Sequence, residues 1–239
     1  MKMTAEDLVR KLRELLPTDL RAVVLYGSAV AGDFREKRSD TNVFMVVERL
    51  DVKTLRALAK PSKQWMKAGN HHPPLLFTPA SLRDSADVFP IEMLDIQEAH
   101  RVLFGDDPLS GIQVNTTNLR LQVEHELRGK LVQLRGDFVL AVNDSRRVMN
   151  LMTASLSKFL ILFRAALRLY EREVPAKKLE ALQALAKHIG FDPDPFVQIH
   201  ALVETPGKLT AADAEQLFES YLQGIERVVQ AVDQLPVPN

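Results

Sequence analysis

Hydrophobic positions in the first half of the chain switch between helical and strand-like spacing. After Thr4, which with Asp7 resembles a capping box, leucines recur every three or four residues, so an amphipathic helix is expected there. Short apolar runs follow at 21–26, 43–47 and 74–77, the first two rich in β-branched residues, and this pattern predicts buried strands. The chain is therefore expected to begin with a helix and then build a sheet.

Further signals fill the gaps between these runs. Asp51 can cap a helix running toward Lys67, and Thr78 with Pro79 opens another short helix. The apolar run 89–96 is predicted to be a fourth strand. This order predicts an α/β (α+β) domain with a small mixed sheet and helices packed against it.

The second half of the chain has a different pattern. From about residue 117 to 233 almost every segment favours helix, with apolar residues at helical spacing. The expected helices span residues 121–134, 148–170, 178–188 and 211–232. They predict an all-α helical bundle, so we expect two domains, at residues 1–110 and 115–239.

Composition limits the classes of function. Lysine plus arginine and aspartate plus glutamate number 31 each, so the formal net charge is zero and no long-range field favours nucleic acid. The absence of cysteine excludes disulfides and thiolate metal sites and favours a reducing compartment, the cytoplasm. Acids near the start, and an arginine directly after the strongest apolar run, argue against a signal peptide and a membrane span.

Small residues between the first two predicted strands form the main candidate for chemistry. Gly27, Ser28 and Gly32 allow a tight turn and close backbone approach, so N–H groups and a hydroxyl can reach a polyphosphate. Asp40 and Asn42 are separated by one residue at the start of the second strand, so their side chains point the same way. A carboxylate there suits Mg²⁺, which prefers hard oxygen ligands.

Several other polar residues each allow two interpretations. Glu92 lies within an apolar run, which favours a metal ligand or a structural ion pair, and Asp95 on the opposite strand face is the alternative acid. Lys158 either meets a phosphate or, more commonly for such a residue, extends from an apolar helix stripe into water. His71 and His72 have no partner at chelating spacing and are expected to face solvent.

These residues resemble the signature of the nucleotidyltransferase superfamily, which includes kanamycin nucleotidyltransferase and the minimal nucleotidyltransferases. Gly27-Ser28, Gly32 and the segment Ser39-Asp40-Thr41-Asn42 are similar to its Gly-Ser plus Asp-x-Asp motif, with Asn42 replacing the second acid. The resemblance implies that a third carboxylate on a later strand, here Glu92, completes a two-metal site with Asp40 and Asn42. It also implies a C-terminal helical bundle, so in architecture it covers most of the chain.

The resemblance implies transfer of a nucleoside monophosphate from a magnesium-bound nucleoside triphosphate to an acceptor hydroxyl, with Glu92 as the base. The acceptor, a small molecule or a protein, would be held between the domains and selected by the bundle. Because Asn42 carries no charge, a degenerate protein that binds nucleotide or a partner without catalysis is the alternative. A helical dimerisation module with the α/β part as scaffold is a third hypothesis, and the apolar helices allow a homodimer.

Overall fold

The structure of the protein is a computed structural model that describes residues 3–27, 30, 41–69, 71–205 and 207–236. The chain divides into two compact units, Met1–Asn115 and Thr116–Asn239. The first unit carries the strands, and the second is helical in its regular structure. Each unit has its own buried apolar residues.

The first unit is built on a mixed four-stranded sheet with strand order β3-β2-β1-β4. Strand β1 pairs antiparallel with both β2 and β4, whereas β2 pairs parallel with β3. The sequence predicted a mixed sheet with helices against it, and the structure confirms this. In chain order the elements are α1 (Ala5–Leu15), β1 (Leu20–Tyr26), β2 (Asn42–Val47), α2 (Val52–Ala68), β3 (Leu75–Phe77), α3 (Pro79–Val88), α4 (Pro90–Glu98) and β4 (His100–Phe104).

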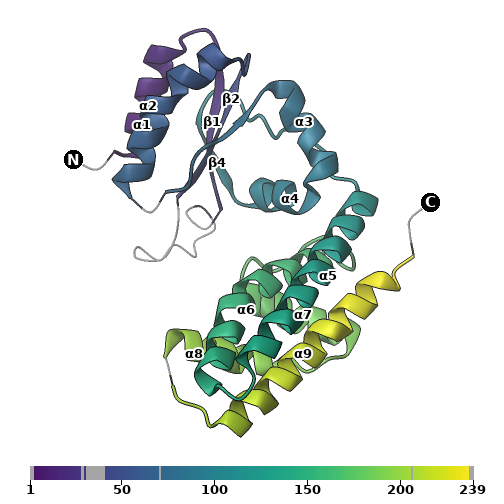
Figure 1. The fold of residues 1–239 in the computed structure, drawn as a ribbon. Coiled ribbons are helices and arrows are strands. Elements are labelled where there is room, and N and C mark those ends of the chain that lie inside the picture. Colours follow the sequence, from purple (N-terminus) through teal and green to yellow (C-terminus); the bar gives the residue numbers. More distant parts are fainter. Residues whose placement is uncertain (1–2, 28–29, 31–40, 70, 206, 237–239) are drawn as a thin grey trace. The chain divides into compact units, whose positions relative to one another are not determined.

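Helices cover both faces of this sheet. Figure 1 shows α1 and α2 on one face and α3 and α4 on the other. Because side chains alternate along a strand, neighbouring residues of β1 and β2 enter different cores. Val23 and Met45 pack toward α1 and α2 in a cluster that includes Leu8 and Trp65. Val24 and Phe44 pack toward α3 and α4, so the central strands are buried on both sides.

Local signals in the sequence fix the starts of these helices. Thr4 and Asp7 form the expected capping box, in which each side chain accepts a hydrogen bond from the other residue's backbone N–H. The Asp51 side chain accepts from Thr54 N–H at 2.8 Å and begins α2. Thr78 likewise accepts from Ser81 N–H, directly before the proline that opens α3.

The prediction of a fourth strand at residues 89–96 is wrong, because Pro90–Glu98 forms helix α4. Pro90 occupies the first turn, where its missing N–H costs nothing, and Met93 and Ile96 are buried three residues apart on the inner helix face. The fourth strand of the sheet follows instead at His100–Phe104, and ends directly before Gly105 at a φ of 80°.

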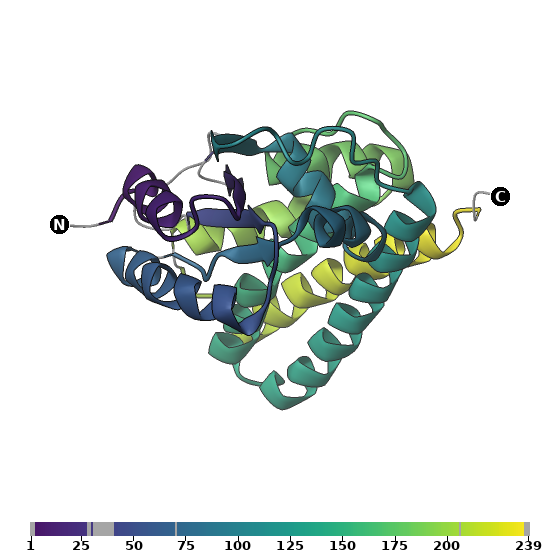
Figure 2. The same ribbon diagram turned by 90° about the horizontal axis from the view of Figure 1, so that it is seen from above.

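The second unit contains α5 (Thr116–Ala141), α6 (Ser145–Leu167), α7 (Lys178–Ile189), α8 (Asp194–Glu204) and α9 (Ala211–Asp233). Figures 1 and 2 show the long helices α5, α6 and α9 packed side by side. The core of this unit is rich in aromatic rings. For example, the rings of Phe196 in α8 and Tyr221 in α9 are in contact at a centroid distance of 4.9 Å. The predicted helical bundle is thus present, with α8 as an additional helix that the proline-rich segment 192–195 was not expected to open.

Helix α6 is the most apolar helix of the bundle. Among the described residues it is the one helix long and apolar enough to cross a membrane, and 44% of its most apolar window is buried. Its apolar side chains, such as Phe159 and Phe163, contact rings of α8 and α9. Helix α6 therefore packs as the core helix of this unit.

Candidate functional site

The candidate site begins where β1 ends. Gly27 follows Tyr26 directly and has a φ of 79°, a conformation that favours glycine. Its N–H donates to the carbonyl oxygen of Ala99 at 2.9 Å, and its own carbonyl accepts from Val30 N–H at 2.9 Å. The glycine therefore starts a tight turn between β1 and β2, as its place in the sequence predicted.

Asn42 lies beside this turn. It opens β2 and is the partner of Tyr26 in the antiparallel register. A β-carbon added to Gly27 would lie 3.3 Å from Asn42 Nδ2, which is closer than most such contacts. The structure therefore brings the glycine of the turn and the residue at position 42 together at one end of the sheet.

The alternation of β2 assigns Asn42 to one face of the sheet. Phe44 and Val46, two and four residues further, pack in the core shared with α3 and α4. Tyr26, opposite Asn42, lies against the same core, and its ring contacts Phe44 at a centroid distance of 6.0 Å. Burial there raises the pKa of the Tyr26 phenol, so it stays a neutral hydroxyl at physiological pH.

Three of the predicted site residues lie outside the described residues. These are Ser28, Gly32 and Asp40. Their convergence with Asn42 therefore stays a prediction from the strand alternation and the short turn.

Glu92 is placed differently from the expectation. It lies in the first turn of α4 with an exposed side chain, and not on a strand. The strand interpretation put Glu92 and Asp95 on opposite faces, but on a helix residues three apart are neighbours. The two acids therefore lie side by side on α4, the helix that packs on the sheet face of Asn42.

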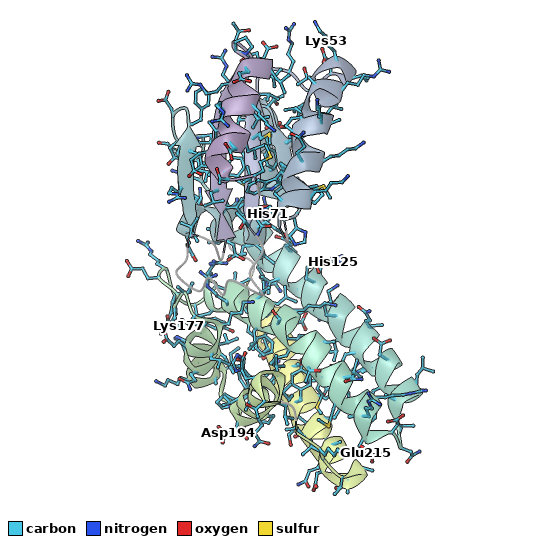
Figure 3. The ribbon with its side chains drawn as sticks, turned by 90° about the vertical axis from the view of Figure 1, so that its left-hand side faces the viewer. Lys53, His71, His125, Lys177, Asp194 and Glu215 are labelled. Carbon is cyan, nitrogen blue, oxygen red and sulfur yellow. The ribbon has the colours of Figure 1, made fainter. Side chains whose placement is uncertain are left out.

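His71 is not solvent-facing, as the sequence had suggested. It is half-buried, its ring stacks on the indole of Trp65 at a centroid distance of 4.0 Å, and its backbone bridges to Thr41, the residue before Asn42. Figure 3 labels His71 in the first unit. His72 is exposed, as expected. His71 is therefore held against Trp65, which belongs to the core between the sheet and helices α1 and α2.

His100 is a residue of this end of the sheet that the sequence analysis missed. It is the partner of Tyr26 on β4, so it shares a row of the sheet with Tyr26 and Asn42. Its Nδ1 lies 3.0 Å from the carbonyl oxygen of Gln97, and its Nε2 lies 3.3 Å from a carboxylate oxygen of Asp107. The short apolar run 102–104 directly before Gly105 was the signal that could have found this strand.

Lys158 belongs to the helical unit. It is exposed on α6 and lines a small cavity of about 80 Å³ together with Lys130, Asp137 and Ser155. A role in binding phosphate therefore stays a prediction, and an exposed ammonium on a long stem fits the alternative interpretation equally well.

Carboxylate and histidine side chains are the candidate metal ligands of this chain, which has no cysteine. No group of three or more of these side chains is close enough to hold a metal ion in the part of the chain that the structure describes. Asp40 is outside that part, so the expected metal site depends on a residue whose surroundings are not described.

Solved structures share this fold. The crystal structure of spectinomycin adenyltransferase AAD(9) from Enterococcus faecialis with ATP and spectinomycin aligns with 94% of this chain and 99% of that chain. The TM-score is 0.57 and the sequence identity is 12%. No protein-family model matches the chain, and no curated protein matches it in sequence. The chain therefore has the nucleotidyltransferase fold, from the sheet through the helical unit.

Proposed function

We propose that the protein transfers a nucleoside monophosphate from a magnesium-bound nucleoside triphosphate to a hydroxyl group of a small molecule or a protein. One observation carries this proposal: in a nucleotidyltransferase fold, Gly27 and Asn42 lie together at the sheet end where the Gly-Ser and Asp-x-Asp motifs are expected to meet. The order of these residues along the chain, with the Gly-Ser pair before the Asp-x-Asn segment, also supports the proposal. As part of the same proposal, we place the protein in the cytoplasm.

The turn after β1 would hold the triphosphate. The N–H groups of Gly27 and Val30 already donate to protein carbonyls, so they give the turn its shape and do not bind phosphate. Within the proposal, the hydroxyl of Ser28 and the backbone near Gly32 contact the phosphates. Glycine at position 27 keeps space for the Asn42 side chain.

Asp40, Asn42 and an acid of α4 would hold magnesium. Among these, Asn42 offers a neutral carbonyl oxygen, which fits Mg²⁺ as an oxygen ligand but supplies no charge. When bound, the ion would neutralise phosphate charge and stabilise the transferring group. The α4 acids are suitable in position because they lie on the helix that covers the sheet face of Asn42.

An acid of α4 would also take the proton of the acceptor hydroxyl. Glu92 is the first candidate, and Asp95 is its neighbour on the same helix. A carboxylate within hydrogen-bond reach of the hydroxyl increases its nucleophilicity toward phosphorus. Replacement of the base, Glu92→Gln or Asp95→Asn, is expected to lower turnover much more than nucleotide affinity.

A small-molecule acceptor is the first choice. The adenyltransferase of the same fold was crystallised with ATP and spectinomycin, and the fold alignment covers 99% of that chain. A protein hydroxyl remains the alternative acceptor within the same reaction.

A second function is favoured by Asn42 itself. An amide at this position lacks one negative charge, and at about 4 Å and an effective dielectric of 20 a pair of unit charges interacts by about 4 kcal/mol. The loss weakens metal binding, so a protein that binds nucleotide without transferring it is the second candidate.

Calorimetry with each nucleoside triphosphate, with and without magnesium, separates these functions. Nucleotide binding together with pyrophosphate release that requires an added hydroxyl compound supports the transferase. Binding without pyrophosphate release supports the nucleotide-binding protein. Failure of every nucleoside triphosphate to bind would contradict both.

A further inference from the structure

The beginning of β2 is held differently by its two neighbouring strands. On one side Asn42 pairs with β1 in the regular antiparallel ladder. On the other side the parallel ladder with β3 begins only at Phe44, which lies opposite Leu75. Prolines at 73 and 74 directly precede Leu75, and a proline has no N–H to donate to a neighbouring strand. The ladder with β3 therefore stops short of Asn42.

An isolated backbone bridge takes the place of the ladder at this point. Thr41, the residue before Asn42, forms a parallel bridge with His71. Between this bridge and the ladder, residues 72–74 lie opposite residues 42–43, so the β3 side carries one extra residue and bulges. On this side of β2, the position of its first residue thus depends on the position of His71.

The His71 side chain is held in a closely fitted place beyond the end of α2 (Figure 3). Its ring is nearly parallel to the indole of Trp65, with an interplanar angle of 12°, and Trp65 is buried in the core. A β-carbon added to Gly69 would lie 2.8 Å from His71 Nε2, which is too close for a real contact. The backbone of Gly69 is extended, with a φ of −167°, so the space for the His71 ring is what glycine provides there.

The stack lies on the sheet face opposite to that of Asn42. Trp65 packs in one core cluster with Val43 and Met45, whose side chains alternate along β2 with those of Asn42 and Phe44. The effect of the stack on Asn42 therefore passes through the backbone of β2 and not through a contact between side chains.

From this geometry we propose that His71 is a positioning residue of the nucleotide site. By stacking on Trp65, His71 fixes the backbone bridge to Thr41, and so the direction in which Asn42 presents its side chain to the magnesium-bound triphosphate. The proposal rests on the proposed function and gives His71 no contact with the nucleotide. Removal of a group that orients a metal ligand typically lowers metal affinity by about 10–100-fold.

The first experiment needs no ligand and measures whether the stack supports the beginning of β2. His71→Ala should shift the emission of the single tryptophan to longer wavelength, because water then reaches the indole. It should also accelerate amide hydrogen exchange at residues 41–43, measured by NMR, because the bridge opens more often. His71→Phe keeps a flat ring and should restore both signals. Wild-type exchange at residues 41–43 in His71→Ala would overturn the proposal.

The second experiment measures nucleotide affinity by calorimetry, with Mg²⁺ and a non-hydrolysable analogue of each nucleoside triphosphate, at a temperature where circular dichroism shows every variant folded. His71→Ala should bind about tenfold more weakly than wild type, and His71→Phe should bind nearly as well as wild type. His72→Ala makes the same change at the adjacent, exposed residue and is the matched control, which should keep the wild-type affinity.

A double-mutant cycle tests whether the His71 ring is the cause. Gly69→Ala should also weaken nucleotide binding, because its added methyl group displaces the ring. In the His71→Ala background the same change at Gly69 should have no further effect, since the ring is already absent. Two effects that add would show that Gly69 acts independently of the stack and would overturn the proposal.

The outcomes separate the positioning role from the proposed function. A wild-type protein that binds none of the analogues contradicts the proposed function, and the role of His71 in it, even if the exchange experiment shows that the stack supports β2. Wild-type binding together with an unchanged affinity of His71→Ala overturns the positioning role alone.

Discussion

Asn42 is the side chain with the most direct consequence for the proposed activity. It lies at the position where the nucleotidyltransferase motif that this segment resembles carries a second acid, and its amide nitrogen is next to Gly27. Asparagine and aspartate have the same shape, so the exchange of one for the other changes charge with little change in packing. The site can therefore be tested by adding the missing charge.

We expect Asn42→Asp to bind Mg²⁺ at least tenfold more tightly, measured by calorimetry in the presence of a non-hydrolysable nucleoside triphosphate. A tenfold change corresponds to about 1.4 kcal/mol, well below the roughly 4 kcal/mol of one close charge pair. Asn150→Asp, at an exposed position of α6, adds the same charge elsewhere and should leave the affinity unchanged. An affinity of Asn42→Asp equal to the control would reject the site.

Gly27 combines a positive φ with a close neighbour. We expect Gly27→Ala to lose about 1–2 kcal/mol of stability from the left-handed backbone and also to weaken nucleotide binding by pressing on Asn42. Gly111→Ala is a matched control, since Gly111 has a φ of 81° but nothing within 4 Å of its added β-carbon. Urea denaturation and nucleotide titration check both effects; equal nucleotide affinities of the two variants would contradict the role of the contact.

The capping residues of the first unit show which elements a sequence can specify. The Thr4, Asp51 and Thr78 caps and the strands 21–26 and 43–47 were predicted close to their observed positions, because each depends on neighbouring residues. The segment 89–96 was predicted to be a strand, but the spacing of its apolar residues is compatible with a strand and with a helix. Tertiary packing of Met93 and Ile96 against the sheet, together with Pro90 in the first turn, favours the helix.

The candidate site was predictable to a lesser extent. The pairing of Gly27 with Asn42 follows from two strands and a turn, which are local, and the structure brings them together. His100 joins the same row only because β4 pairs with β1 across more than seventy residues. No spacing in the sequence specifies that pairing. In addition, the predicted sheet already had a fourth strand at 89–96, so β4 was not recognised.

Asp51 gives α2 a stability that depends on pH. The hydrogen bond from Thr54 N–H is the main cause that lowers the pKa of the Asp51 carboxyl below its usual value near 4. A lowered folded-state pKa stabilises the protein above the unfolded pKa, and this contribution is lost as the pH falls through the folded value.

We therefore expect wild-type protein to melt above Asp51→Asn at neutral pH, with the difference disappearing as the pH is lowered below about 4. Asparagine keeps the capping oxygen and removes the charge, so the comparison isolates the contribution of the carboxylate charge to stability. Thermal denaturation followed by circular dichroism between pH 3 and 7 measures the difference. A gap that is constant over this range would show that the charge of Asp51 does not contribute.

The division into two units predicts how the protein unfolds. The single tryptophan, Trp65, is 1% exposed in the first unit, so its fluorescence follows that unit alone. Most helical residues belong to the second unit, so far-ultraviolet circular dichroism mainly follows the bundle. Each unit has a core of its own, so the two signals need not change together.

We expect Leu156→Ala, in the core of the bundle, to lower the urea midpoint of the dichroism by an amount that corresponds to about 2–5 kcal/mol. The midpoint of the tryptophan fluorescence should hardly move. Leu58→Ala is the matched change beside Trp65 in the first unit and should give the reverse pattern. If both midpoints moved together in both variants, the chain would unfold as one cooperative unit, and a ligand that stabilises the sheet would then also protect the bundle. Independent midpoints instead mean that nucleotide binding at the Gly27 turn, as proposed, raises the fluorescence midpoint alone.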